Sequence, residues 1–240
     1  LLHSVFKKIG KPARADFVPD SFQLEAIEAV KSADCLVTAP TGSGKTWIAQ
    51  EAILSVFNRG GRCWYASPLK ALSNSKWVEF SACFDGANVG IVTGDTKENT
   101  NAPIIVGTTE ILRNQLYDSM HRGEDFPCDL VVIDEAHYLG DADRGVVWEE
   151  IMIYLPPRVN LLLLSATIGN DDDLAVWLSG LRGKPCVVIK ERKRPVPLYP
   201  LFLHPSGRIL PLRRPSRPDL HAPRHGRRRW GAPVRVLSRD

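Results

Sequence analysis

Short apolar runs, rich in β-branched residues, alternate along the chain with longer amphipathic stretches. The runs are too short and too uniformly apolar to be half-exposed, so we predict that they form buried strands. These strands cover residues 35–39, 63–67, 89–93, 105–109, 130–134 and 161–165. The amphipathic stretches predict helices over residues 23–30, 46–57, 71–82, 110–117, 147–155 and 172–178. Strand–helix repetition at this spacing predicts an α/β fold, a three-layer sandwich in which helices flank both faces of a parallel sheet.

The periodic pattern ends near Lys193. The prolines of RPVPLYPL favour an extended backbone, and beyond them Pro, Arg and Gly dominate without periodicity. We therefore predict a folded domain over residues 1–193, a connector over residues 194–210 and a tail over residues 211–240 that forms no core. Two interpretations of the tail stay open: a disordered basic segment, or a reading frame lost near residue 211. Lost-frame translation of GC-rich codons would explain why ten Arg and no Lys follow residue 200.

The net charge of +4 is unevenly distributed. Residues 201–240 contain ten Arg and two acids, whereas the preceding residues contain 21 basic and 25 acidic side chains. The predicted folded domain is therefore mildly acidic. The basic isoelectric point is no evidence that this domain binds nucleic acid.

Hydropathy and cysteine spacing exclude several classes of protein. No apolar run is long enough for a membrane span, so we expect no membrane association, and the apolar start of the chain is too short for a secretory signal. The five cysteines lie far apart without a C-x-x-C pair. This spacing argues against a structural zinc site or a disulfide framework and favours the reducing cytoplasm.

The stretch APTGSGKT follows the first predicted strand and precedes an amphipathic helix. It matches the phosphate-binding pattern G-x-x-x-x-G-K-[ST] except that alanine takes the first position. The loop residues that we expect to hold a nucleotide are Ala39, Pro40, Thr41, Gly42, Ser43, Gly44, Lys45 and Thr46. In such a loop Lys45 meets the β- and γ-phosphates of ATP, and the Thr46 hydroxyl joins Mg²⁺. The alternative is a glycine-rich turn that contains a lysine by chance.

A second motif, LVVIDEAH, is an apolar strand that ends in two carboxylates about ninety residues after the loop. We expect Asp134 to hold the metal through water and Glu135 to orient and deprotonate the attacking water, so both belong with Thr46 to the metal site. His137 completes the candidate catalytic set of Lys45, Asp134 and Glu135, although a lone histidine is more often a structural hydrogen bonder. Alone, the motif could be a solvated turn; with the loop it predicts nucleotide hydrolysis.

The loop, DEAH and the later SAT triplet (Ser165, Ala166, Thr167) together resemble superfamily two DExH helicases. FVPDSFQLEAI, SPLKALSNSK, TGD, TTEILRN and RPVPL narrow the resemblance to Ski-like helicases, over about residues 15–203. The resemblance implies the first RecA-like lobe of a P-loop NTPase, with ATP and Mg²⁺ as cofactors and alanine tolerated at position 39. It also implies that Phe17 stacks on adenine and that Gln23 hydrogen-bonds the base edge. Without the resemblance, Phe17 would be a core residue and Gln23 a solvent-facing one.

The same resemblance implies that the lobe binds single-stranded RNA or DNA through contacts with the nucleic-acid backbone. The implied contact residues are Pro68, Lys70, Thr93, Gly94, Thr108, Thr109 and Arg113. The SAT triplet would couple hydrolysis to strand movement. Simpler interpretations stay open. Lys70 and Arg113 could be ordinary surface charges, and Thr108 and Thr109 could cap the following helix. Ser165 and Thr167 could form a hydrogen bond at the end of their strand. Trp47, Trp64 and Trp77 are expected to pack between elements.

Helicases of this type place ATP between two RecA-like lobes, and arginines of the second lobe stabilise the transition state. No Q-x-x-G-R-x-G-R-like segment follows the connector. We therefore expect the chain to bind Mg²⁺–ATP, to hydrolyse it very slowly and not to unwind nucleic acid alone. Two alternatives remain: a stand-alone module that binds nucleic acid through its basic tail, and a P-loop ATPase of another kind.

Overall fold

The computed structural model describes residues 17–140, 145–166, 169–195, 201–203, 205, 207 and 209–211. The chain divides into two compact units, Leu1–Val196 and Pro197–Asp240. The described part of the second unit contains an antiparallel pair, β9 (Leu201–Leu203) with β10 (Ile209–Pro211), which the sequence pattern did not predict. The predicted tail lies outside the described residues beyond Pro211.

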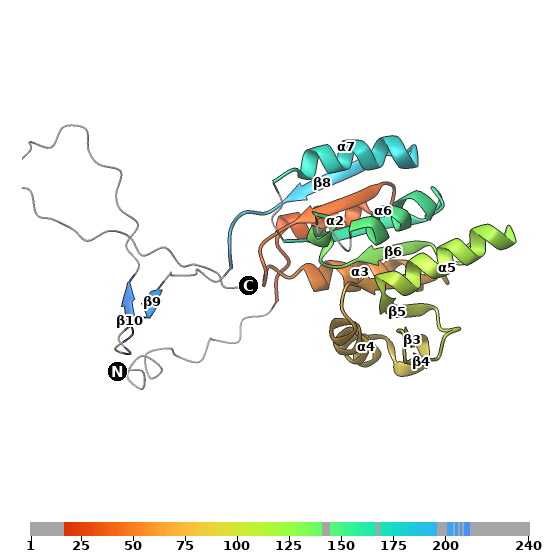
Figure 1. The fold of residues 1–240 in the computed structure, drawn as a ribbon, viewed down its shortest axis with the longest axis horizontal. Helices are drawn as coiled ribbons and strands as arrows, with labels where there is room; N and C mark the ends of the chain where they lie inside the picture. The colour runs from red at the N-terminus through yellow and green to blue at the C-terminus, as the bar shows by residue number, and fades with distance from the viewer. Residues whose placement is uncertain are drawn as a thin grey trace, which may run out of the picture. The chain divides into compact units, whose positions relative to one another are not determined.

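The first unit is built on one sheet with the strand order β4-β3-β5-β2-β6-β7-β1-β8 (Figure 1). The strands are β1 (Asp34–Thr38), β2 (Cys63–Ser67), β3 (Val89–Val92), β4 (Lys97–Glu98), β5 (Ile104–Thr108), β6 (Leu130–Ile133), β7 (Asn160–Ser165) and β8 (Cys186–Lys190). All six predicted strands are confirmed. Every pairing between two predicted strands is parallel, as expected. The additional strand β4 pairs with β3 antiparallel at one side of the sheet. This two-residue strand has no apolar pattern and is defined only by its pairing.

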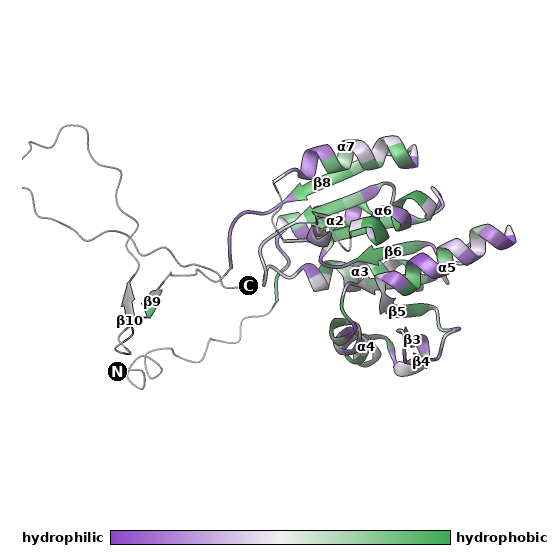
Figure 2. Ribbon diagram, viewed as in Figure 1, coloured by the Kyte–Doolittle hydropathy of each residue, from purple (hydrophilic) through white to green (hydrophobic). Residues whose placement is uncertain are grey.

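Helices cover both faces of the sheet, which confirms the three-layer sandwich. They are α2 (Ser21–Ala29), α3 (Lys45–Phe57), α4 (Lys70–Phe84), α5 (Thr109–Arg122), α6 (Gly145–Tyr154) and α7 (Asp171–Arg182), with 3-10 turns η1 (Gly86–Asn88) and η2 (Ala136–Gly140). The core on one face contains side chains of α2, α3 and α4, and the core on the other contains those of α5, α6 and α7. Figure 2 shows apolar residues concentrated in the strands, with polar residues along the helices.

The helices α5 and α7 extend furthest beyond their predicted ends, by five and four residues. Their last turns are largely polar, so the apolar periodicity stops before the helix does. Each ends at a glycine in the left-handed region, Gly123 with φ 64° and Gly183 with φ 66°. Glycine tolerates this conformation without a steric penalty and commonly ends helices in this way.

Parallel strands bring their carboxyl ends to one edge of the sheet. β7 lies between β1 and β6, with Thr38 opposite Ser165 and Ile133 opposite Leu163. The P-loop follows β1, the DEAH motif follows β6 and the SAT triplet ends β7, so these three motifs share the edge at which α/β sheets bind ligands.

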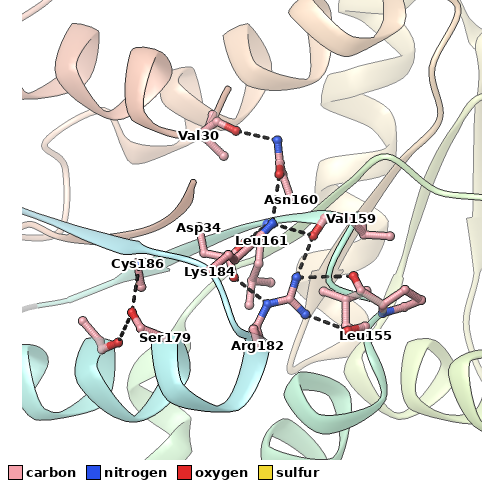
Figure 3. A network of polar contacts seen from close by, with 12 residues as sticks. Val30, Asp34, Leu155, Val159, Asn160, Leu161, Ser179, Arg182, Lys184 and Cys186 are labelled. Carbon is pink, nitrogen blue, oxygen red and sulfur yellow. Dashed lines mark hydrogen bonds and ion pairs between the residues drawn. The ribbon is translucent and has the colours of Figure 1, made fainter. Parts of the chain in front are cut away.

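A buried ionic network lies at the other end of the strands, where β1 begins (Figure 3). The Arg182 side chain, in the last turn of α7, places Nε 2.5 Å from Asp34 Oδ2 at the start of β1. Its Nη1 and Nη2 donate to the carbonyls of Leu155 at 2.8 Å and Val159 at 2.6 Å. Lys184 Nζ lies 2.9 Å from Asp34 Oδ1. The network therefore joins the beginning of β1 to α7 and to the chain that connects α6 with β7.

Within the described ranges, no helix has both the length and the apolar character needed to cross a membrane. All five cysteines are free.

Candidate active site

The loop between β1 and α3 depends on glycine at two positions. Gly42 and Gly44 have φ angles of 84° and 82°, a region that L side chains rarely adopt. A Cβ at Gly44 would also lie 2.4 Å from Gln23 Nε2. Gly44 is the N-cap of α3 and contributes no side-chain cap, and the buried Ser43 Oγ has no partner among the described residues. The loop thus presents unused donors at a helix N-terminus, the arrangement that binds anions.

The ammonium of Lys45 lies within this loop. Its Nζ donates to the carbonyl of Ala39 at 2.8 Å and to that of Pro40 at 3.3 Å. Burial lowers the pKa of Lys45 from its ordinary value of 10.5, and the negative charges of Glu135 and Asp134 partly oppose that shift. The lysine and the two carboxylates therefore lie in one electrostatic environment.

The carboxylates at the end of β6 are held in place by several hydrogen bonds. Asp134 Oδ1 accepts from the backbone N–H of Glu135 at 2.9 Å, and Oδ2 accepts from Tyr65 Oη at 2.5 Å. Glu135 has a φ of 55°, an uncommon conformation for a non-glycine residue, and its Oε2 lies 3.2 Å from Nδ1 of His137. Uncommon backbone conformations of this kind cluster at functional sites.

Tyr65 is a site residue that the sequence pattern missed. Burial raises its pKa well above 10, and the adjacent charge and hydrogen bond of Asp134 raise it further. The phenol therefore stays protonated and donates to the carboxylate. One feature of the sequence could have indicated this role. The hydroxyl of a tyrosine in the middle of a buried apolar strand needs a hydrogen-bond partner.

Thr46, the candidate magnesium ligand, is engaged by a residue of another helix. Its Oγ1 accepts from Lys76 Nζ of α4 at 2.8 Å, and the same ammonium lies 2.8 Å from Glu79 Oε2. Lys76 ends the segment SPLKALSNSK, whose resemblance implies nucleic-acid contact, and no local pattern of Lys76 or Glu79 indicates contact with the P-loop.

Gln23 packs against the P-loop and is only 2% exposed, so the solvent-facing alternative is wrong. Its Nε2 donates to the carbonyls of Ser43 at 3.2 Å and Gly44 at 3.4 Å. Its Oε1 accepts from the backbone N–H of Asp20 at 2.8 Å and forms part of the capping box of α2. The adenine contact stays a prediction, and it requires Gln23 to exchange at least one of these partners.

Phe17 is 63% exposed, so the core-packing alternative is also wrong. Its ring centroid lies 5.1 Å from that of Trp47. Trp47 and Trp77 pack partly buried against one core, and Trp64 is buried in the other, as expected for packing residues. Phe17 is thus an exposed ring that lies beside the first turn of α3, and its adenine contact stays a prediction.

The implied nucleic-acid contacts at the ends of β2 and β3 lie close together. Lys70, the first residue of α4, forms an ion pair with Asp95, and Thr93 Oγ1 donates to the same carboxylate at 3.1 Å. Pro68 is buried beside Lys70, whereas Gly94 is exposed beside Thr93. The lysine is thus an exposed cation with an internal carboxylate partner, at the same edge as the P-loop.

The remaining implied contacts follow β5. Thr108 is the N-cap of α5 but makes no side-chain cap hydrogen bond, and Thr109 Oγ1 donates to Glu110 Oε2 at 3.4 Å. Arg113 Nη1 donates to Glu150 Oε2 of α6 at 2.8 Å, while its Nε is buried without a partner among the described residues. Arg113 therefore joins α5 to α6, and its contact with nucleic acid stays a prediction.

The SAT triplet touches the P-loop through its backbone. The Ser165 carbonyl accepts from the N–H of Ala39 at 3.1 Å, and the buried Ser165 Oγ has no described partner. Ala166 is half-buried, and Thr167 lies outside the described residues. A movement at the end of β7 would therefore act directly on the first residue of the loop.

The sequence profile of the family described as "DEAD/DEAH box helicase" matches residues 20–174. The chain belongs to this family. Among curated proteins, it is 50% identical over 202 residues to the DExH-box ATP-dependent RNA helicase DExH15, chloroplastic, of Arabidopsis thaliana, across 82% of this chain. It is 44% identical over 194 residues to the antiviral helicase SKI2 of Saccharomyces cerevisiae, across 79% of this chain. The helicase chain spans 17% and 15% of the lengths of these two relatives.

Solved structures identify the fold of this helicase domain. The DEAD-box helicase Mss116 bound to ssRNA and UDP-BeF has a TM-score of 0.60 at 18% identity, over 80% of this chain and 43% of that one. The Pyrococcus furiosus Hef helicase domain has a TM-score of 0.55 at 22% identity, over 73% of this chain and 39% of that one. These likenesses confirm the RecA-like fold, and the identities to SKI2 and DExH15 confirm the resemblance to Ski-like helicases.

The site of this helicase domain fits a magnesium–triphosphate group. The free donors at the start of α3 and the Lys45 ammonium suit phosphate oxygens, and the oxygens of Thr46 and Asp134 suit Mg²⁺. Mg²⁺ typically binds one or two protein carboxylates together with oxygens of the substrate phosphates. Asp134 would supply such a carboxylate here, and the nucleotide would supply the phosphate oxygens.

Proposed function

We propose that the chain is the first RecA-like lobe of an ATP-dependent RNA helicase. In this proposal the lobe binds Mg²⁺–ATP and single-stranded nucleic acid, and it hydrolyses ATP efficiently only with a second RecA-like lobe. The observation that carries the proposal is the placement of Lys45, Asp134 and Glu135 at the carboxyl ends of β1 and β6, which flank β7 in the sheet. RNA is favoured over DNA because the Arabidopsis thaliana relative is an ATP-dependent RNA helicase.

In this proposal residues 1–193 form the ATP-binding domain, residues 194–210 form a connector, and residues 211–240 form a tail that takes no part in ATP hydrolysis. Cytoplasmic location stays a prediction from cysteine spacing, because one relative is named as chloroplastic.

Each residue has a distinct role in the proposed reaction. Lys45 leaves the loop carbonyls and binds the β- and γ-phosphates, and Thr46 and Asp134 hold the metal. When bound, Mg²⁺ would supply positive charge that offsets the negative charge on the transferred phosphoryl group and on the ADP leaving group. Glu135 accepts a proton from the attacking water, and His137 orients it through the 3.2 Å contact at Oε2. Tyr65 fixes the Asp134 carboxylate through its 2.5 Å hydrogen bond.

Glu135→Gln should leave Mg²⁺–nucleotide affinity unchanged and abolish the slow hydrolysis. The amide keeps the shape of the carboxylate but cannot take the proton, and general-base removal typically costs about 10²–10⁴-fold in rate. Single-turnover hydrolysis of labelled ATP, with excess protein, measures the rate, and calorimetric titration with ADP measures the affinity. Glu98→Gln, on the exposed edge strand β4, is the control. Weak nucleotide binding by Glu135→Gln would mean that this carboxylate does not have the proposed role.

Lys70→Ala should weaken single-stranded RNA binding to a similar degree for all sequences, because a phosphate contact carries no base information. The slope of log affinity against log salt should fall by about one. Asp95→Asn should instead strengthen binding, since it frees Lys70 from its carboxylate partner. Lys31→Ala, just after α2 and beside the amino end of β7, is the control.

A chain that lacks residues 204–240 separates the helicase lobe from a basic-tail binding module. If the lobe binds the single-stranded RNA, the truncated chain keeps its affinity for the RNA, and Lys70→Ala still weakens that affinity. If truncation removes most of the salt slope, the tail does the binding and the helicase proposal loses its nucleic-acid component.

A further inference from the structure

A polar network links the P-loop helix to the neighbouring helix α4. Lys76 Nζ lies 2.8 Å from both Thr46 Oγ1 and Glu79 Oε2, and the Lys76 side chain is 17% exposed. Glu79 Oε1 accepts in turn from Gln50 Nε2 of α3 at 3.0 Å. The ammonium is therefore fixed between one hydroxyl and one carboxylate.

The hydroxyl that Lys76 engages is the one that the proposed function assigns to Mg²⁺. A hydroxyl oxygen offers two lone pairs, and a donated hydrogen bond from an ammonium occupies one of them. A divalent cation on the same oxygen would lie only a few ångströms from the ammonium. The two positive charges repel at that distance, strongly so in a partly buried site.

We propose that Lys76 occupies the cation position at Thr46 in the nucleotide-free chain and competes there with Mg²⁺. When the metal binds, Lys76 withdraws to Glu79, whose carboxylate neutralises it. Lys76 is a positioning residue in this account, because it acts on the metal ligand and touches no phosphate. The inference rests on the proposed function, since it requires a Mg²⁺–nucleotide complex at the P-loop.

Two substitutions should shift the magnesium requirement in opposite directions. Lys76→Met removes the competing charge but keeps the length of the side chain, so half-saturating Mg²⁺ should fall about threefold or more. Glu79→Gln removes the carboxylate that receives Lys76, so half-saturating Mg²⁺ should rise by about the same factor. A purely structural role would shift both variants in the same direction or neither.

The experiment titrates Mg²⁺ into the full chain with a fluorescent ADP analogue, which avoids hydrolysis, and repeats nucleotide binding in EDTA. Lys31→Met is the matched control, because Lys31 also pairs with a glutamate three residues away in sequence, Glu28. Opposite shifts with little change in EDTA support the proposal. Weaker binding of Lys76→Met in EDTA, at unchanged half-saturating Mg²⁺, would make Lys76 a phosphate ligand and overturn it.

Variants that match Lys31→Met would also overturn the competition. If the wild-type chain bound no Mg²⁺–ADP at all, both this inference and the proposed function would fail. Binding by the wild type with unshifted variants would remove the inference alone.

Discussion

Replacing Arg182 by methionine lowers the free energy of unfolding by about 3–5 kcal/mol, the usual effect of breaking one side of a buried ion pair. The side chains of Arg182 and Asp34 are each 1% exposed. Without the guanidinium, the carbonyls of Leu155 and Val159 lose donors in the interior (Figure 3). Lys184 stays 2.9 Å from the Asp34 carboxylate and compensates only in part.

Urea unfolding followed by tryptophan fluorescence measures this loss. Arg122→Met is the matched control: Arg122 also lies in the last turn of its helix, but it is 63% exposed and its pairs are 3.7 Å long, so its loss should stay below about 0.5 kcal/mol. The double variant Arg182→Met/Asp34→Leu should recover part of the loss, because it removes the unpaired charge as well. Equal midpoints for Arg182→Met and Arg122→Met would show that the network contributes nothing particular.

Lys45→Met lowers nucleotide affinity by about 10²-fold, which corresponds to about 2.7 kcal/mol, a typical loss when one partner of a desolvated charge pair is removed. Among the described residues the ammonium donates to the loop carbonyls of Ala39 and Pro40, neutral partners that it can exchange for phosphate oxygens. Because Lys45 is proposed to contact phosphate directly, the loss should occur both with Mg²⁺ and in EDTA. This distinguishes it from Lys76, whose substitution should shift the metal requirement alone.

Calorimetric titration with ADP measures the effect, and a melting curve confirms that Lys45→Met is folded. Lys31→Met, which has the same change in charge at the other edge of the sheet, should bind as the wild type does. A dissociation constant for Lys45→Met within about twofold of the wild-type value would remove Lys45 from the phosphate site.

Local patterns predicted the frame of this molecule well. The strands β1, β2, β3, β5, β6 and β7 are uniformly buried or nearly so, and a continuous apolar run expresses that burial directly. The two unpredicted strands of the sheet lie at its edges. β8 is only half-buried, and β4 consists of two exposed charged residues, so neither has the burial that produces a clear apolar signal.

The candidate site was predictable where its residues follow one another in the chain and not where they meet only in space. Lys45 and Asp134 stand in compact motifs whose residue order reflects their chemistry. Lys76 reaches Thr46 from a helix 30 positions later, and Tyr65 reaches Asp134 from another strand. Those contacts depend on how α4 packs beside α3 and on the order of β2 and β6 in the sheet.

The most direct test of the account is a crystal structure of the chain with Mg²⁺ and a non-hydrolysable ATP analogue. We expect one bound complex at the carboxyl edge, with Lys45 Nζ on the β- and γ-phosphate oxygens and Thr46 Oγ1 on the metal. Asp134 should reach the same metal through water, with Glu135 facing the terminal phosphate. A triphosphate held by Lys45 with both carboxylates turned away from its metal, or bound at another surface, would contradict the account.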